Sequence, residues 1–310
     1  VQQLDALFKA SVKRLRDAIE AYIADGTLPD PAARSDGSYA YPEIHLTWGG
    51  GPDSAEPQRS FGRLSAPGHY VTSITKPALF ADYLEEQIDI LIADYGVTVE
   101  VKPGRQEIPF PYVLDAGTEF GDVRAIDLAR WFPATELAHI GDEIADGLLS
   151  SDADMPHPLS LFDGLRTDFS LARLRHYTGT PPEHVQRYVL FTNYHRYVDE
   201  FVRWACAQLG NGSGYEMLSC PGGVTVTQNT QDPLSTVADS AWRRHQMPAW
   251  HLTAPDKSGI TLVNIGVGPS NAKTITDHLA VMRPEAWLMI GHCGGLRASQ
   301  RIGDYVLAHP

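Results

Sequence analysis

The first 25 residues carry apolar side chains at the spacing of one helix face. These side chains recur every three or four positions, and most positions between them are polar or charged. Gly26 follows the last of them and Pro29 lies just beyond, as is typical where a helix ends. The pattern predicts an amphipathic helix with this apolar face: Leu4, Leu7, Phe8, Val12, Leu15, Ile19, Tyr22 and Ile23.

The chain from there to about residue 150 mixes strand patterns with one further helix pattern. Apolar, strand-type runs predict strands at 41–48, 61–64, 69–75 and 97–101, and a helix is predicted to open at Pro77 and end at Gly96. Residues 108–113 contain two prolines and are predicted to be extended. Glycines 49–51 are interpreted as a plain loop, because no Lys-Ser/Thr follows as in a phosphate-binding P-loop. Together these patterns predict an α+β domain.

The second part of the chain alternates strand and helix patterns. Strands are predicted at 187–192, near 215–219 and at 259–265, a helix at 194–209, a short helix within 163–177 and a piece of helix at 240–246. One face of the helix at 194–209 is predicted to carry Tyr197, Phe201, Trp204 and Ala205. A polar, proline-containing stretch at 150–158 predicts a domain boundary. We therefore expect a first domain at 1–155, a linker with a short helix at 156–182, and a second domain at 183–310.

The segment 260–297 is the richest in candidate chemistry. Two apolar strand-type runs each end in glycine, and a helix pattern separates them, which predicts a strand–loop–helix–strand unit. Open α/β sheets bind ligands where such loops gather. Gly266, Val267 and Gly268 form the first loop, where the glycines allow close approach of backbone to a ligand. His292 lies in the second loop, where it serves a site or simply hydrogen-bonds backbone. Cys293 is predicted to be a small buried side chain under the loop, not a nucleophile.

Net charge and cysteine usage exclude several classes of protein. The formal net charge is −13, which argues against a nucleic-acid partner, since binding a phosphate backbone needs a basic surface. No apolar run reaches membrane-spanning length, and the N-terminus lacks the features of a secretory signal. Three scattered cysteines fit neither a disulfide framework nor a CxxC metal site. His245 and His251 also lack the spacing of zinc ligands. We expect an acidic protein of the reducing cytoplasm, without a metal or a membrane partner.

Long ordered blocks of this sequence carry a family resemblance. They are residues 28–34, 61–63 and 106–113 in the first part, and 168–180, 189–194, 197–204, 245–251 and 260–297 in the second. Through these blocks, nearly the whole chain resembles AMP nucleosidase, the bacterial family that hydrolyses AMP to adenine and ribose 5-phosphate.

The resemblance implies a fold class and a set of partners. The class is α/β: an N-terminal α+β regulatory domain, followed by a catalytic domain of the purine nucleoside phosphorylase type. Members of the family are homohexamers without a cofactor, activated by ATP and inhibited by phosphate. Their catalytic domain continues past the segment that matches 303–309. The acid that protonates the purine and the glutamate that holds the ribose are therefore expected outside this sequence, which leaves the catalytic domain incomplete.

The resemblance also assigns candidate site residues. Phosphorylases of this fold hold phosphate with an arginine before the second loop and a serine within it, and Met289 and His292 occupy those places, with Gly291 between them. Loss of the arginine and gain of a histidine favour hydrolysis, with His292 as the catalytic residue that orients water. Asn193 and Arg196 match the first phosphate-binding loop, although Arg196 is equally suited to a surface ion pair with Asp199 or Glu200. A purine nucleoside phosphorylase and a non-catalytic nucleotide-binding fragment remain alternatives.

Overall fold

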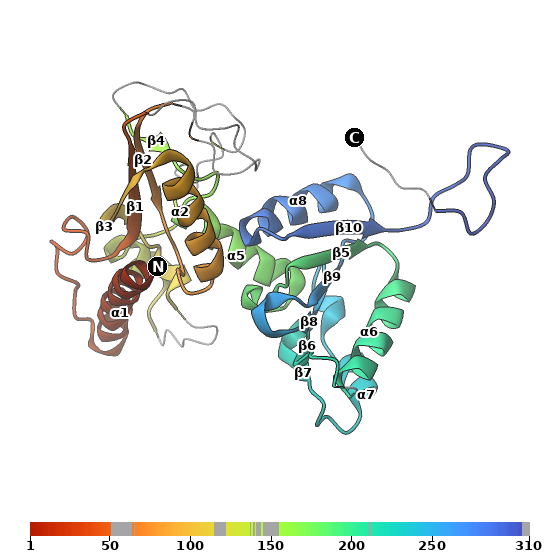
Figure 1. The fold of residues 1–310 in the computed structure, drawn as a ribbon. Coiled ribbons are helices and arrows are strands. Elements are labelled where there is room, and N and C mark those ends of the chain that lie inside the picture. Colours follow the sequence, from red (N-terminus) through yellow and green to blue (C-terminus); the bar gives the residue numbers. More distant parts are fainter. Residues whose placement is uncertain are drawn as a thin grey trace. The chain divides into compact units, whose positions relative to one another are not determined.

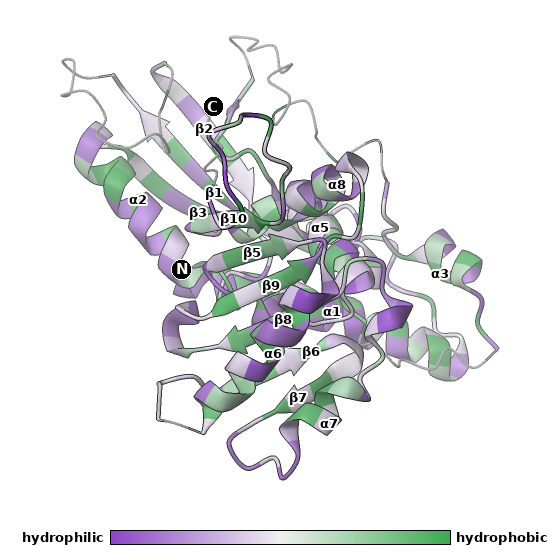
Figure 2. Ribbon diagram, turned by 90° about the vertical axis from the view of Figure 1, so that its right-hand side faces the viewer, coloured by the Kyte–Doolittle hydropathy of each residue, from purple (hydrophilic) through white to green (hydrophobic). Residues whose placement is uncertain are grey.

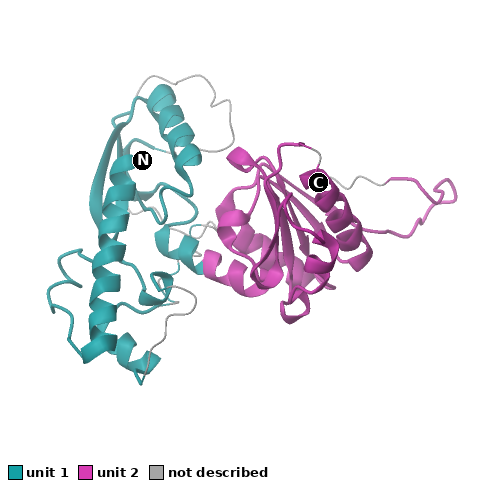
Figure 3. Cartoon of the chain, turned by 90° about the horizontal axis from the view of Figure 1, so that it is seen from below, with its two compact units in different colours: residues 1–169 teal, residues 170–310 magenta. Residues whose placement is uncertain are grey.

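The computed structural model describes residues 1–50, 64, 66–114, 122–136, 138, 140, 144, 155–210 and 212–305. The chain divides into two compact units, Val1–Phe169 and Ser170–Pro310 (Figure 3). Residues 61–63 of a predicted strand, 51–53 of the predicted glycine loop and 150–154 of the predicted boundary lie outside the described residues.

The first unit contains a four-stranded sheet in the order β3-β1-β2-β4. Its strands are β1 (Ala40–Trp48), β2 (Gly68–Ser73), β3 (Thr98–Glu107) and β4 (His157–Pro158). The central strand β1 pairs antiparallel with both β2 and β3, and β4 adds a short parallel pairing to β2. Ile44 and Leu46 of β1 are buried, so the alternation that predicts this strand also directs one of its faces into a core.

Helices complete the first unit. The predicted N-terminal helix is confirmed as α1 (Gln2–Asp25), which buries Leu15 and Ile19 and ends at Gly26, whose φ of 79° is left-handed and suits glycine. The helix predicted from Pro77 begins later, as α2 (Ala81–Tyr95), and its apolar and polar bands are visible in Figure 2. A third helix, α3, spans Ala125–Trp131.

One prediction for the first unit is wrong. Residues Phe110–Tyr112 form a short 3₁₀ helix and are not extended. Pro111 lies within the first turn of this helix, where its fixed φ is compatible with helical backbone and its missing N–H needs no partner. The turn inserts Phe110 into the core beside Ile108 and Val113.

The second unit is built on a six-stranded sheet in the order β10-β5-β9-β8-β6-β7. The strands are β5 (Tyr188–Thr192), β6 (Met217–Cys220), β7 (Val224–Val226), β8 (Ala249–Thr253), β9 (Ile260–Asn264) and β10 (Ala286–Ile290). β10, β5 and β9 are mutually parallel, whereas β8, β6 and β7 are added antiparallel (Figure 1). The two sheets and their helices confirm the predicted α/β class.

Helices cover both faces of the second sheet. Figure 1 shows α6 (His195–Leu209) and α7 (Pro233–Ala238) on one side and α8 (Pro269–Leu279) on the other. Neighbouring strand residues point to opposite faces. Trp250 therefore packs in the cluster under α6, while Ala249 packs with Ile275 of α8 and Leu174 of α5 (Gly164–Thr178). The inner parallel strands β5 and β9 are largely buried, as their apolar runs predict, whereas the edge strand β10 is largely exposed.

The predicted buried face of α6 needs correction. The buried residues are Val198, Val202, Ala205 and Leu209. Trp204 is 42% exposed. The true stripe is rotated by about one residue from the predicted one. Branched valines fit the ridged surface of the strands, and the larger aromatic rings lie toward its edges. Elsewhere in this unit α7, β7 and β8 have no counterpart in the prediction, and residues 240–246 contain only a 3₁₀ turn, Trp242–Arg244.

A chain of polar side chains crosses the core of this unit at His251 of β8. Its Nε2 lies 2.7 Å from Thr180 Oγ1, and its Nδ1 lies 2.9 Å from Thr261 Oγ1. Thr178 Oγ1 donates to Leu174 O, so Thr180 must donate to Thr178, 2.9 Å away. Thr180 is then an acceptor for His251 Nε2–H, which leaves Nδ1 to accept from Thr261. Burial lowers the pKa of His251 to about 3, so the ring is neutral at neutral pH.

Candidate active site

The carboxyl ends of three parallel strands meet at one edge of the second sheet. Thr192, the last residue of β5, is in register with Asn264 of β9 on one side and with Ile290 of β10 on the other. The three loops that follow therefore leave the sheet at the same level. These loops contain the candidate site residues predicted from the sequence except Arg196, which lies in the first turn of α6, and Met289, which lies within β10.

The first of these loops follows β5 and enters α6. Asn193 Oδ1 is shielded from solvent and has no hydrogen-bond partner among the described residues. A buried carbonyl oxygen in that condition is unfavourable by about 1–3 kcal/mol. Arg196 lies in the first turn of α6 and is exposed. It forms no ion pair within the described part of the chain, and Glu200, one of its expected partners, pairs with Arg203 at 2.6 Å. Its guanidinium group is thus available to a ligand.

The second loop, after β9, is built on two glycines in left-handed or strained conformations. Gly266 has a φ of 63° and Gly268 a φ of 111°, which other residues rarely adopt. The loop is tied down at both ends: Asn264 Oδ1 accepts from Gly266 N at 3.0 Å, and Asn271 Nδ2 donates to Ile265 O at 2.9 Å. Val267 at its tip is 85% exposed. The first turn of α8 follows, with no side chain capping its N–H groups.

The third loop, after β10, brings His292 to the first. His292 Nε2 lies 2.9 Å from Tyr197 Oη, and its ring centroid lies 4.7 Å from that of Tyr194. A β-carbon placed on Gly291 would lie 3.8 Å from Asn193 Oδ1 and 4.0 Å from the Tyr194 ring. The loops after β5 and β10 are therefore in direct contact, as their shared edge requires.

The structure places some of the predicted site residues close together and leaves others apart. Asn193, Gly291 and His292 form one cluster, whereas the glycine loop of β9 shares the edge but makes no hydrogen bond to His292 within the described residues. Met289 is 48% exposed on an edge strand. Sequence reasoning assigned Tyr194 and Tyr197 no role at the site. The sequence feature that could have indicated them is a pair of tyrosines spaced i, i+3 where a predicted strand passes into a predicted helix.

His195 connects this edge with a pocket on the α6 side of the sheet. Its Nδ1 lies 3.2 Å from Asn264 Nδ2, and its ring lies 4.9 Å from that of Trp242. The pocket has a volume of about 510 Å³. None of the predicted site residues lines it. Its lining residues are His195, Val198, Asp199, Val202, Arg203, Leu234, Val237, Ala238, Trp242, Arg243 and Trp250.

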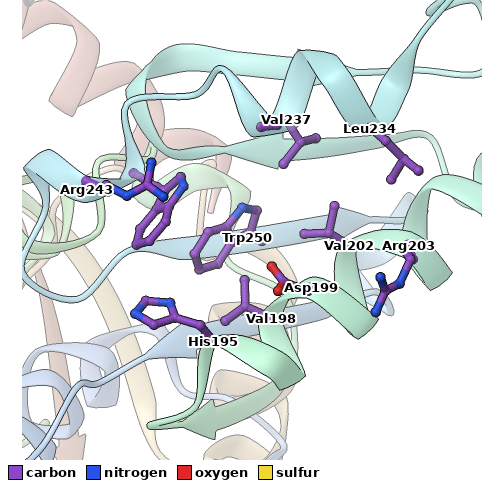
Figure 4. Close-up of a pocket in the computed structure, with 11 residues that line it drawn as sticks. His195, Val198, Asp199, Val202, Arg203, Leu234, Val237, Arg243 and Trp250 are labelled. Atoms are coloured by element: carbon purple, nitrogen blue, oxygen red, sulfur yellow. The ribbon is translucent and has the colours of Figure 1, made fainter.

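Two tryptophan rings and two arginine side chains contribute to the lining of this pocket. Figure 4 shows Trp250 between Val198 of α6 and Val237 of α7. The Arg243 guanidinium lies 4.4 Å from the centre of the Trp242 ring. The Trp250 side chain is almost fully buried, and its Nε1 has no hydrogen-bond partner in the described structure.

Cysteines and metal ligands contribute little to the site. Cys293 is exposed, which corrects the prediction that it lies buried under its loop. A β-carbon placed on the next residue, Gly294, would have no atom within 4 Å, so the described residues leave the loop uncovered there. Among the described residues, no cluster of histidine, cysteine and acidic side chains is arranged to hold a metal ion. Nor does any helix in the described ranges have the length and apolar character needed to cross a membrane.

A mixed α/β sheet whose parallel strands end in glycine loops, with a histidine and an available arginine at the same edge, is the framework of an enzyme or binding domain for a small polar ligand. The sequence matches the family described as "Bacterial AMP nucleoside phosphorylase N-terminus" over residues 1–156. The chain therefore belongs to this family.

Two curated relatives extend the similarity across the second unit. The AMP nucleosidase of Escherichia coli (strain K12) is 57% identical over 312 residues, covering 100% of this chain and 64% of the relative. The AMP nucleosidase of Escherichia coli O157:H7 gives the same values. The chain thus spans 64% of the length of these relatives.

Among solved structures, the crystal structure of AMP nucleosidase from Bacteroides thetaiotaomicron VPI-5482 matches 44% of this chain and 45% of that chain. The identity is 25% and the TM-score 0.30, which is too low to define a shared fold.

Proposed function

We propose that the protein to which this chain belongs hydrolyses the N-ribosidic bond of AMP, giving adenine and ribose 5-phosphate. The observation that carries the proposal is the 57% identity to AMP nucleosidases over an alignment that covers the entire chain and therefore spans the site loops. Identity at that level preserves backbone geometry, so three loops meeting at one edge are expected to serve the same chemistry in both proteins.

The geometry is suited to this substrate. Arg196 presents forked donors that match a phosphate group, and no ion pair within the described residues occupies it. The glycines of the β9 loop let ribose approach the backbone. His292, across the edge, orients the attacking water. Water oxygen bonds to C1′ while the bond from C1′ to the purine nitrogen breaks and its electron pair leaves with adenine. We assign no residue of this chain to protonation of that purine.

The edge favours water over phosphate as the nucleophile. A phosphorylase must bind a second phosphate ion, and the place of its arginine is taken here by the uncharged, half-exposed Met289. A methionine thioether offers no donor to an anion, whereas the His292 imidazole can accept a proton from water. This difference supports hydrolysis over the phosphorylase alternative.

The proposal includes regulation and assembly. The first unit serves as a regulatory domain, with ATP as activator and phosphate as inhibitor, and the protein acts as a cytoplasmic homohexamer that needs no cofactor. Support for these points comes from the family resemblance and the match of residues 1–156.

Adenine release from AMP, followed with and without added phosphate and in the presence of ATP, tests the reaction. The experiment uses protein purified from the complete reading frame. We expect adenine and ribose 5-phosphate without added phosphate. Release that requires phosphate would identify a phosphorylase instead. Binding of AMP without release would identify a nucleotide-binding module, and intact AMP with ATP present would refute the proposal.

A further inference from the structure

We infer that Tyr197 is a positioning residue that holds His292 by Nε2, so that Nδ1 is the nitrogen presented to the attacking water. This inference rests on the proposed function and assigns a role that the family resemblance did not supply. The observation behind it is the 2.9 Å contact between Tyr197 Oη and His292 Nε2. Nδ1 makes no hydrogen bond to any described residue, so it is the nitrogen left for water.

Tyr197 lies on a rigid element, whereas His292 lies on an exposed loop. Tyr197 N donates to Tyr194 O at 3.1 Å in the first turn of α6, and the helix is anchored to the sheet through Val198 and Val202. His292 is exposed, and a β-carbon placed on Gly294, two residues further on, would meet no atom within 4 Å. A histidine on such a loop samples several rotamers unless a partner fixes it. Tyr197, held in place by the helix, therefore fixes the orientation of the His292 ring, which the loop alone would leave variable.

The ring of Tyr194 restricts the same imidazole from a second direction. Its centroid lies 4.7 Å from that of His292, and that of Tyr197 lies 5.4 Å away. The two tyrosine rings also meet each other edge to face, with centroids 5.9 Å apart. Two aromatic rings and one hydrogen bond thus define both the position and the rotation of the His292 ring.

The hydrogen bond determines how the proton moves. A neutral imidazole has one N–H and one lone pair. For Nδ1 to accept a proton from water, Nε2 must carry the hydrogen and donate it to Tyr197 Oη. As water attacks C1′, its proton passes to Nδ1 and the adenine leaves with the electron pair of the broken bond. The positive charge on the ring is then stabilised by Tyr197 Oη, and His292 returns the extra proton to solvent.

The variant Tyr197→Phe tests the inference, since it keeps the ring and removes only the hydroxyl. We expect kcat for AMP to fall at least about 10-fold, a small part of the roughly 10²–10⁴-fold effect of a positioned acid or base, with little change in KM. Tyr215→Phe is the matched control, because it removes a hydroxyl from the same unit away from His292, and it should retain wild-type turnover. Wild-type hydrolysis with an unchanged kcat in Tyr197→Phe would overturn the inference but not the proposed function. A wild-type protein that does not hydrolyse AMP would overturn both.

A spectroscopic readout separates positioning from a loss of folding. Nitrogen-15 NMR of the His292 ring distinguishes a protonated Nε2 from a protonated Nδ1. We expect the wild type to hold the proton on Nε2 and Tyr197→Phe to show a mixture of tautomers. Tyr194→Phe, which leaves the hydrogen bond in place, should keep the wild-type tautomer. Identical His292 spectra in the wild type and Tyr197→Phe would overturn the inference.

Discussion

Mild acid should destabilise the second unit through one buried histidine. His251 is 1% exposed, and burial lowers its pKa from 6.5 to about 3, with the positive charge of nearby His184 adding to the effect. In the unfolded chain this histidine binds a proton below about pH 6.5, whereas in the folded chain it does not until about pH 3. The unfolded state thus binds more protons between these values, so the free energy of unfolding falls as the pH falls.

The size of the effect follows from the two pKa values. Each pH unit below the unfolded pKa costs about 1.36 kcal/mol while the folded ring stays neutral. Between pH 7.5 and pH 5.0 the expected loss is about 2 kcal/mol, since pH 5.0 lies about 1.5 units below the unfolded value of 6.5. That is a large share of the stability of an ordinary domain.

Urea unfolding measures this loss, with the fluorescence of the buried Trp250, which adjoins His251 in β8, reporting on unfolding of the second unit. The matched variant is His251→Gln, which keeps a neutral hydrogen-bonding side chain but cannot titrate. All other histidines are common to both proteins, so the difference between their pH dependences isolates His251. We expect the wild type to lose about 2 kcal/mol more than the variant between pH 7.5 and pH 5.0. Equal losses in the two proteins would refute a neutral, buried His251.

Three further outcomes are expected. If His292 orients water, His292→Ala should lower kcat at least about 100-fold with a much smaller effect on AMP affinity, and steady-state kinetics in which affinity alone falls would remove that role. Gly259→Ala should destabilise the second unit by about 3 kcal/mol, because its β-carbon would lie 2.0 Å from a backbone carbonyl of β8. Gly294→Ala has open space and serves as the control in the same thermal unfolding assay; equal melting temperatures would contradict the packing. At pH 8 a thiol reagent should label Cys293 before Cys220, since burial raises the pKa of Cys220 to about 12, and mass spectrometry of the labelled peptides would show the reverse order if Cys220 were accessible.

Local patterns predict much of the secondary structure. The period of apolar residues identifies α1, and the glycine after it marks its end because a left-handed residue is needed there. The apolar runs of β5 and β9 identify buried strands for the same local reason. The edge of the sheet that carries the candidate site also follows from local signals, because a glycine comes within two residues of the end of both β9 and β10.

What the sequence does not predict depends on contacts between distant segments. The partner of His292 is Tyr197, 95 positions away, and the contact exists only because β10 pairs beside β5. The buried face of α6 is likewise determined by the strands beneath it, which select valines and leave Trp204 half exposed. The neutral state of His251 comes from its burial in the folded core, where Thr180 and Thr261 provide its hydrogen-bond partners. None of these arrangements has a local period that a sequence pattern can reveal.

Hydrolysis of AMP in water enriched with oxygen-18 tests the central claim most directly. If water attacks C1′, the ribose 5-phosphate formed without added phosphate carries one oxygen-18 atom at its anomeric carbon, provided that samples are taken before that oxygen exchanges with solvent. A sample of unlabelled ribose 5-phosphate in the same water corrects for the exchange. The account predicts one labelled oxygen for each adenine released. Adenine release that requires added phosphate and yields ribose 1,5-bisphosphate without the label would contradict it.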